Sequence, residues 1–277
     1  MSPVQSDEED LTRKQRREQA RAERKQLEEA EAARAVRRTR LSQLGIVVAV
    51  VVVAIVAIVI ATGSGGKSSG PVKAGSGKAN QNVALVSSQI GGIPESGNAL
   101  GNPNAPVTLQ YFADLECPIC RNFTLGALQS IIPQWVRTGK LRIEFHNMQT
   151  ATREPEVFRT QQIAALAAGK QNLLWPFAEL FYHEQGEENS GYVTEQYLQN
   201  LAQQVPGLNL TAWTAARNDP TLASQITTDA QVVTAQGFTG TPSFLIGKTG
   251  GAVQKFEPGS YTDPSSYNAA IERLLKA

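Results

Sequence analysis

Alternating hydrophobic and polar positions predict a strand, a helix and a second strand near the middle of the chain. Residues 107–113 alternate and then become apolar on both faces, which predicts a central β-strand. Apolar residues recur about every four positions over 123–136, which predicts an amphipathic helix that begins at or just after Cys117 and ends at Gly139. Residues 141–145 predict the second strand. This order implies a right-handed parallel unit.

The region that follows is predominantly helical. Residues 153–237 contain little strand pattern, and helix start signals occur at Thr194 and at Asp219-Pro220. Gly237 suits a helix C-terminus, because glycine readily adopts the left-handed conformation found there. Further elements are predicted as strands at 243–246 and 252–256 and as a helix after Asp263-Pro264. The pattern therefore predicts an α/β core with a helical insertion at about residues 153–237.

A long uncharged stretch lies nearer the N-terminus. Residues 44–61 carry no charged or hydrogen-bonding side chain, and as a helix they would extend ~27 Å, close to the ~30 Å of a bilayer core. A cleaved signal peptide is the alternative, but its apolar region is usually only ~7–15 residues long. We therefore predict a transmembrane signal-anchor at residues 44–62. Arg37, Arg38 and Arg40 precede it, so the N-terminus is expected in the cytoplasm and the rest of the chain outside.

The segments on either side of this stretch differ in composition. Residues 1–43 are rich in Ala, Glu, Lys and Arg, with opposite charges at helical spacing, which predicts a charged cytoplasmic helical tail. Residues 63–99 begin with Gly and Ser and are predicted to be a flexible linker and domain entry. Residues 100–277 are numerous enough to form one well-buried domain.

Charge and cysteine content exclude several classes of protein. The 277 residues include 26 Lys and Arg against 25 Asp and Glu, a net charge of +1, which argues against nucleic-acid binding through overall positive charge. The chain has only two Cys and two His, so it is neither a disulfide-dense scaffold nor a Cys-rich or His-rich metal protein. Both cysteines lie in one tetrapeptide, Cys117-Pro118-Ile119-Cys120. We infer that they serve chemistry rather than packing.

The position of this tetrapeptide between a strand and a helix has a chemical consequence. A sulfur at a helix N-terminus lies among unpaired backbone N–H groups at the positive end of the helix dipole, so the pKa of Cys117 is expected to be lowered. Cys120 is one turn further along and is expected to be less accessible. Pro118 fits the first helical turn, where its missing N–H costs nothing. The spacing lets the two sulfurs form a disulfide, with Cys117 as the attacking thiol and Cys120 as the resolving one.

Two other readings of the pair are possible. Zinc binding needs about four ligands, and the only other candidates are His146 and His183, whose spacing does not match that of a zinc finger. No metal site is therefore expected. A purely structural disulfide would close a loop of only four residues, which contributes little stability through loop closure.

Several segments resemble DsbA-like thiol:disulfide oxidoreductases of the thioredoxin superfamily. Residues 112–120 resemble the active-site signature of that family, and residues 240–244 (Gly-Thr-Pro-Ser-Phe) resemble its cis-proline loop. The similarity extends over residues 100–277 and includes the entry segment 100–107 and Trp175-Pro176-Phe177. The resemblance implies a thioredoxin-like fold with a helical insertion and no cofactor beyond a redox-active disulfide between the two cysteines.

The resemblance also implies roles for the residues around the sulfurs. Thr241 and Pro242 are expected to pack against the sulfurs and to pair with an extended substrate chain. Glu116 either tunes the pKa of Cys117 or is a solvated turn residue. The most oxidising members of the family carry His at the position of Ile119. The isoleucine of this chain therefore lacks a hydrogen-bonding group near the thiolate. Pro118 is the third neighbour with a possible effect on the pKa of Cys117.

Taken together, these observations predict an extracytoplasmic, membrane-anchored enzyme that oxidises dithiols of exported proteins through a mixed disulfide. The family resemblance implies a membrane, quinone-linked partner similar to DsbB or vitamin K epoxide reductase that reoxidises the pair. A thiol reductase or isomerase would use the same two cysteines in the reduced state. A membrane-anchored peptide-binding or chaperone module is the alternative outside enzymology.

Overall fold

The computed structural model describes residues 72–277, and the predicted cytoplasmic tail and transmembrane anchor lie outside these residues. Within the described part of the chain, none of the helices has the length and apolar character that crossing a membrane requires. The first described helix, α2 (Gly77–Ile90), falls inside the segment predicted as a flexible linker.

In the segment 63–99, predicted as a flexible linker and domain entry, regular structure begins at Gly77. The Ser76 hydroxyl caps α2 by accepting a hydrogen bond from the Ala79 amide, and Val86 and Ile90 are buried against the rest of the domain. Two short strands follow, β1 (Glu95–Ser96) and β2 (Ala99–Leu100), and both join the main sheet. A few apolar residues at helical spacing therefore stabilise a helix despite the glycine and serine around them, because tertiary packing buries each of them.

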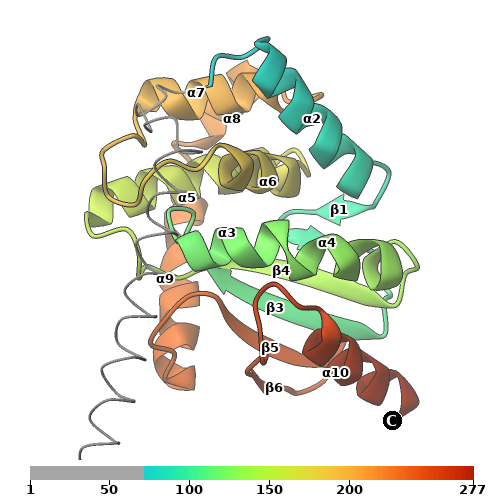
Figure 1. The fold of residues 1–277 in the computed structure, drawn as a ribbon. Helices are drawn as coiled ribbons and strands as arrows, with labels where there is room; N and C mark the ends of the chain where they lie inside the picture. Colours follow the sequence, from blue (N-terminus) through green and yellow to red (C-terminus); the bar gives the residue numbers. More distant parts are fainter. Residues whose placement is uncertain (1–71) are drawn as a thin grey trace, which may run out of the picture. The chain divides into compact units, whose positions relative to one another are not determined.

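One mixed sheet of six strands organises the domain, in the order β1-β2-β4-β3-β5-β6 (Figure 1). The central strands β3 (Val107–Ala113) and β4 (Leu141–Asn147) run parallel, as the strand, helix and strand pattern predicts. The strands β5 (Ser243–Lys248) and β6 (Val253–Phe256) complete the sheet in antiparallel pairings. Because β3 is the central strand, both of its faces are buried.

The helix between β3 and β4 is broken into three parts rather than continuous. It consists of α3 (Pro118–Leu125), α4 (Ala127–Ile131) and a π-helical turn, η1 (Ile132–Val136). The break falls at Gly126, where an added Cβ would lie 2.9 Å from the Thr262 backbone, so glycine permits the close approach. Pro133 in the π-helical turn has no N–H to donate, which is a usual cause of an irregular turn.

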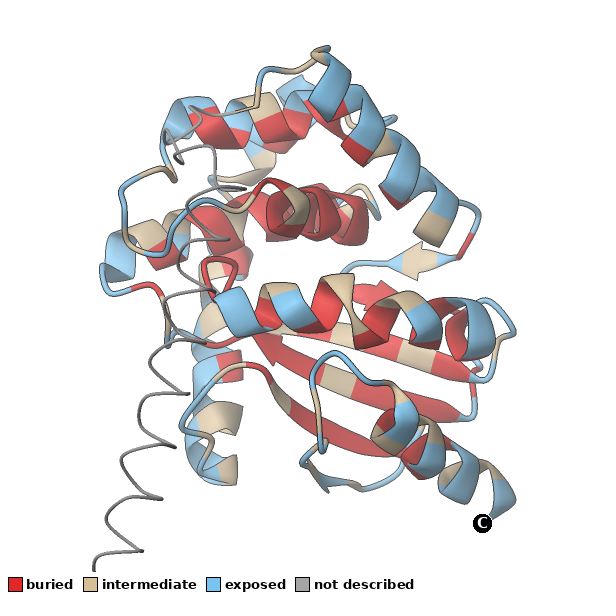
Figure 2. Cartoon of the chain, viewed as in Figure 1, coloured by how far each residue is buried: buried red, intermediate tan, exposed pale blue. Residues whose placement is uncertain are grey.

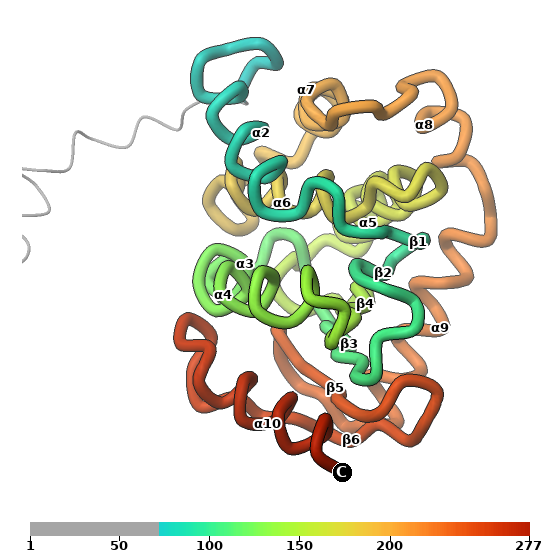
Figure 3. Tube along the Cα trace, turned by 90° about the vertical axis from the view of Figure 1, so that its right-hand side faces the viewer, coloured from blue at the N-terminus to red at the C-terminus, as the bar shows by residue number. Residues whose placement is uncertain are grey.

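Helices cover both faces of the sheet (Figures 1 and 3). The helices α3, α4 and α10 (Ser265–Lys276) lie on one face, and α9 (Pro220–Gln236) lies on the other. On the first face, the side chains of Tyr111, Phe123, Phe244 and Tyr267 form an aromatic cluster with ring centroids 4.9–5.5 Å apart. This cluster fixes α3 against the strands that end at the cysteine pair.

The predicted helical insertion is confirmed and forms a separate layer above one edge of the sheet. It contains α5 (Pro155–Gly169), α6 (Leu174–Glu184), α7 (Glu195–Gln204) and α8 (Leu210–Ala216), and α9 then returns to the sheet. As predicted, Thr194 and Asp219 are N-caps, and Gly237 ends α9 in the left-handed conformation. Figure 2 shows that α6 is buried along its length, whereas α9 is mostly exposed or half-buried.

Candidate functional site

The cysteine pair lies at the point where β3 ends and α3 begins. Cys117 is the N-cap residue of α3, and its Sγ accepts a hydrogen bond from the Cys120 amide at 3.3 Å. Pro118 occupies the first helical position, where no N–H is required. Both cysteines are free thiols in this structure, and Cys117 is 4% exposed while Cys120 is fully buried. Only the first sulfur is therefore accessible to another molecule.

The Thr241-Pro242 peptide bond is cis and lies directly against this sulfur. The Cys117 thiol donates a hydrogen bond to the Thr241 carbonyl oxygen at 3.4 Å. The antiparallel register of β3 with β5 pairs Phe112 with Ser243, which places the loop before β5 beside the end of β3. Residues more than 120 positions apart in the sequence thus meet at one site, because β3 and β5 are neighbouring strands and the end of β3 lies beside the start of β5.

The local environment separates the acidities of the two thiols. Hydrogen bonding from Cys120 lowers the pKa of Cys117 to about 7, with further contributions from Thr241 and from the Ile119 amide, although burial opposes the shift. Burial raises the pKa of Cys120 well above its ordinary value, and the neighbouring Cys117 adds to this effect. At neutral pH the accessible sulfur is therefore partly thiolate, and the buried one remains a thiol.

This difference predicts the pH dependence of alkylation. The reduced protein should react with iodoacetamide at Cys117, and the rate should reach half its maximum near pH 7, because only the thiolate is nucleophilic. Cys120 should stay unmodified over the same range, since it is buried and protonated. Alkylation quenched at set times, followed by peptide mass spectrometry, measures the labelled fraction of both cysteines in one sample. Equal labelling of the two cysteines would contradict the assignment.

Asp114 is a fully buried carboxylate that organises the backbone around the site. Its Oδ2 accepts hydrogen bonds from the amides of Thr150, Ala151 and Thr152 at 2.9–3.1 Å, and its Oδ1 accepts from the Thr152 hydroxyl and the Glu116 amide. Thr150 is in turn hydrogen-bonded to the Thr241 hydroxyl. One carboxylate thereby connects the start of the cysteine motif with the loop after β4 and, through it, with the cis-proline loop.

Glu116 lies beside Cys117 in the sequence but contacts the helical insertion. Its side chain is buried, and its Oε1 accepts a hydrogen bond from the Asn189 amide at 3.3 Å. Burial raises the pKa of Glu116 above its ordinary value, partly offset by hydrogen bonds from Thr152 and Asn189. The buried position excludes the solvated-turn alternative. Ile119 is 38% exposed at the rim of the site, beside the accessible sulfur.

Two further groups contact the motif and were not predicted from the sequence. The Gln185 side chain at the end of α6 donates hydrogen bonds to the carbonyl oxygens of Leu115 and Cys117, at 2.7 and 3.1 Å. The Tyr111 hydroxyl lies beneath the site, 3.4 Å from the carbonyl oxygen of Cys120 and 3.3 Å from the Tyr182 hydroxyl. No motif marks a glutamine nearly 70 residues away in sequence, so only the packing of α6 against α3 reveals it.

The two histidines lie apart from the sulfurs in sequence and belong to other networks. His146, near the end of β4, has its Nδ1 2.8 Å from the Asp229 carboxylate of α9. Burial by itself would lower the pKa of His146, but hydrogen bonds with Asp229 and Glu144 outweigh it and raise the pKa to about 9. His183 lies in α6. Residues 72–277 bring no three His, Cys, Asp or Glu side chains into an arrangement that would hold a metal ion.

A hollow lies alongside the cis-proline loop. It has a volume of about 380 Å³ and is lined by the loop from Gly237 to Phe244 and by Lys255, Phe256 and Tyr261. The Tyr261 side chain in this lining is 37% exposed. Because the hollow runs along the cis-proline loop, it lies where an extended peptide could pair with the loop backbone.

Glu179 in α6 is a buried carboxyl group that receives no hydrogen bond from the described residues. Burial raises its pKa from 4.5 to about 8. Because the folded pKa is the higher one, the stabilising effect of this group is complete below pH 4.5 and is lost as the pH rises toward 8. The fold therefore tolerates Glu179 at neutral pH only in its protonated form.

Replacing Glu179 by glutamine should remove this pH dependence. Between pH 5 and pH 8, the parent protein should lose ~3 kcal/mol of unfolding free energy through Glu179, since each unit of pKa shift corresponds to ~1.4 kcal/mol, and the variant should not show this loss. Urea denaturation at the two pH values measures the change. The exposed Glu156→Gln on α5 is the control and should show no such difference. Parallel pH profiles for the parent and Glu179→Gln would rule out a neutral buried carboxyl group.

Comparison with known proteins agrees with the fold. The thioredoxin family model matches residues 95–257. The probable disulfide bond formation protein D of Bacillus anthracis is 22% identical over 187 residues, covering 64% of this chain and 78% of that protein. Disulfide bond formation protein D of Bacillus subtilis is 26% identical over 152 residues, covering 53% of this chain and 66% of that protein.

Solved structures show the same fold. The oxidised form of BdbD from Bacillus subtilis superposes with a TM-score of 0.56 at 21% identity, covering 67% of this chain and 99% of that one. DsbA of Chlamydia trachomatis gives a TM-score of 0.53 at 15% identity, covering 65% and 91%. The predicted α/β fold of the DsbA-like type, with its helical insertion, is thereby confirmed.

Proposed function

Because the chain belongs to the thioredoxin family, we propose that its cysteine pair oxidises dithiols of exported proteins. It is a thiol:disulfide oxidoreductase of the DsbA-like type. One observation carries the proposal for the site: the accessible Cys117 sulfur lies at a helix N-terminus, 3.4 Å from the carbonyl oxygen that precedes a cis-proline. This geometry presents one sulfur, and only one, to a peptide bound along the loop.

The oxidised enzyme holds a disulfide between Cys117 and Cys120. A client thiolate attacks the Cys117 sulfur, a mixed disulfide forms, and Cys120 leaves and takes up a proton. A second client thiolate then attacks the client sulfur of the mixed disulfide, and Cys117 leaves as a thiolate. The client loses two electrons and two protons as its disulfide forms. The enzyme pair gains both electrons and the proton that Cys120 takes up, and the other proton goes to solvent.

The lowered pKa of Cys117 favours this direction of transfer. A thiolate that is stabilised in the reduced enzyme is a good leaving group and makes the reduced form more stable, so the disulfide becomes a stronger oxidant. The helix N-terminus and the neighbouring thiol supply that stabilisation. Among the chain neighbours of Cys117, the Ile119 amide contributes to this stabilisation, and Glu116 and Pro118 are the further positions where substitution would test it.

The same proposal includes the position of the enzyme in the cell. Residues 44–62 anchor the chain in the cell membrane, with the tail of residues 1–43 in the cytoplasm and the catalytic domain outside. A membrane, quinone-linked protein similar to DsbB or vitamin K epoxide reductase accepts the two electrons. The Cys117–Cys120 disulfide itself carries the two electrons, so this chain needs no bound metal or organic cofactor for the exchange.

The redox state of the pair in living cells tests the direction of electron flow. Rapid acid quenching and alkylation with a mass-shifting maleimide should show Cys117 and Cys120 mainly oxidised. A pair found mainly reduced would support a reductase or isomerase instead. The Cys120→Ser variant should accumulate mixed disulfides with exported proteins, because the resolving thiol is missing. Failure to trap any client would favour a peptide-binding module with an incidental cysteine pair.

A further inference from the structure

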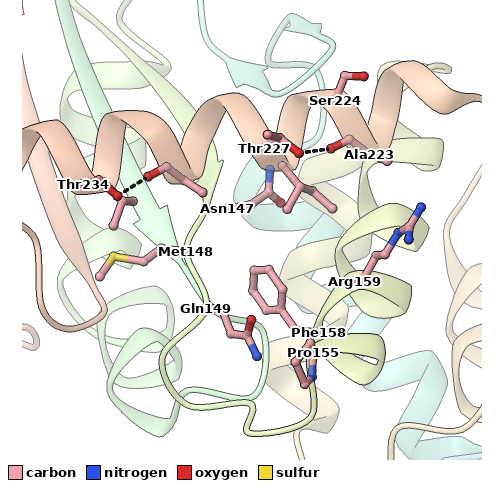
Figure 4. Close-up of a pocket in the computed structure, with 13 residues that line it drawn as sticks. Asn147, Met148, Gln149, Pro155, Phe158, Arg159, Ala223, Ser224, Thr227 and Thr234 are labelled. Atoms are coloured by element: carbon pink, nitrogen blue, oxygen red, sulfur yellow. Dashed lines mark hydrogen bonds between the residues drawn. The ribbon is translucent and has the colours of Figure 1, made fainter.

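A second hollow lies between α9, the start of α5 and the segment after β4 (Figure 4). Its volume is about 550 Å³, within the ~300–1,000 Å³ of small-molecule sites. Neither cysteine nor the cis-proline loop lines it. The lining residues used below are Asn147, Met148, Gln149, Phe158, Arg159 and the exposed stripe of α9 around Ala230.

The floor and one wall of this α5–α9 groove are apolar. Met148 and Phe158 are buried beneath it, and Ile226 and Val233 extend from α9 along one side. This apolar side of α9 is only partly covered by the rest of the domain. An apolar or aromatic group placed here would remove further hydrophobic surface from water.

The uncharged polar side chains of the groove offer acceptors rather than free donors. The side-chain nitrogen and the backbone amide of Asn147 both donate to Asp229, and no described residue donates to the buried Oδ1 of Asn147. The Gln149 amide nitrogen already donates to the carbonyl oxygens of Thr152 and Arg153. Thr227 and Thr234 donate their hydroxyls to carbonyl oxygens of their own helix. A ligand therefore has to bring its own N–H or O–H group.

Arg159 of α5 is the one charged residue that lines the groove. Its side chain is exposed, and it forms no ion pair with any residue in the described part of the chain. A planar guanidinium matches a carboxylate in shape and charge. The groove thus combines an apolar floor, a wall of acceptors and a single cation.

We propose that the α5–α9 groove binds a small amphiphilic carboxylate that has an aromatic or aliphatic body and one N–H or O–H donor. The body lies on Met148 and Phe158, the donor bonds to the exposed acceptors of Gln149 and Thr227, and the carboxylate pairs with Arg159. This site is separate from the thiol chemistry, and the proposal does not depend on the direction of electron flow.

The methionine content offers a site-specific reporter. The chain has two methionines, Met1 and Met148, and the second lines the groove. The full chain labelled with ¹³C at the methionine methyl groups gives one signal from the groove and one from the N-terminus. Titration with indole-3-acetate, which has an aromatic body, one N–H and a carboxylate, should shift the Met148 signal saturably and leave the Met1 signal in place.

Three comparisons define the site. The neutral indole-3-acetamide should bind about three- to fivefold more weakly, and Arg159→Gln should weaken indole-3-acetate to a similar extent, as expected for a solvent-exposed ion pair. Ala230→Trp should fill the groove and abolish the shift, whereas Ala235→Trp, exposed on α9 outside the groove, should not. The proposal is overturned by an unsaturable Met148 shift, by equal affinity for acid and amide, or by equal effects of the two tryptophan variants.

Discussion

Replacing Cys117 by alanine should reduce thiol oxidation to the uncatalysed rate. The variant keeps the fold, because the side chain is small and alanine tolerates the N-cap backbone conformation at a cost of only ~1 kcal/mol. The remaining Cys120 is fully buried and its pKa is raised well above the ordinary value, so it cannot replace the missing nucleophile. Oxidation of a reduced client peptide with two thiols, followed by loss of free thiol, measures the effect.

The matched control is the second cysteine. Cys120→Ser retains the accessible thiol and should still react with a client disulfide, but the product should remain a stable mixed disulfide because no internal thiol resolves it. Circular dichroism spectra of the two variants and the parent protein should coincide. Thiol oxidation by Cys117→Ala at more than a trace of the parent rate would show that Cys117 is not the attacking group.

Replacing Asp114 by alanine should destabilise the domain by ~3–5 kcal/mol. The carboxylate is fully buried and accepts hydrogen bonds from three consecutive amides, those of Thr150, Ala151 and Thr152. Without it these donors remain buried and unsatisfied, and each such group costs ~1–3 kcal/mol. The loop also contacts Thr241, so the reactivity of Cys117 should fall in the same variant. Urea denaturation measures the change in the free energy of unfolding.

A half-buried aspartate provides the comparison for this measurement. Asp219 caps α9, accepts hydrogen bonds from Thr221 and pairs with Lys170, but it holds no buried amides, so Asp219→Ala should cost clearly less than Asp114→Ala. Asp114→Asn should lie between the two alanine variants, because the amide preserves the shape and only some of the acceptors. Similar losses for Asp114→Ala and Asp219→Ala would mean that the buried network does not hold the loop.

Hydrophobic periodicity was enough to predict the helices and strands in which one complete face is buried. The central strands β3 and β4 follow from alternation, and the cysteine pair at the start of α3 follows from the change to a period of about four. Residues 77–90 were misjudged because their apolar residues are few and polar neighbours are frequent. Their burial comes from packing against α6, a helix about 90 residues away in the sequence, which no local pattern reports.

For the cis-proline loop, the family resemblance identified the residue and the structure explained its position. Fourteen prolines occur in the chain, and composition does not distinguish Pro242 from the others. The resemblance to the DsbA-like family singled it out, and the register of β3 with β5 explains why it contacts Cys117. Glu116 shows the opposite case, since its position next to Cys117 in the chain does not reveal that its carboxylate contacts Asn189 in the helical insertion.

The sequence by itself located the candidate reactive pair, because a lone cysteine pair at a strand-to-helix junction is a local feature. Local spacing and helix geometry decide which of the two residues is the N-cap. Only the tertiary structure decided what surrounds those sulfurs. The Thr241 carbonyl, the Asp114 network and the Gln185 amide come from segments far apart in the chain, and burial in a shared interior fixes their geometry. Hydrogen bonds formed across such distances leave no periodic trace in the sequence, so they emerge only when the sheet and the insertion are packed together.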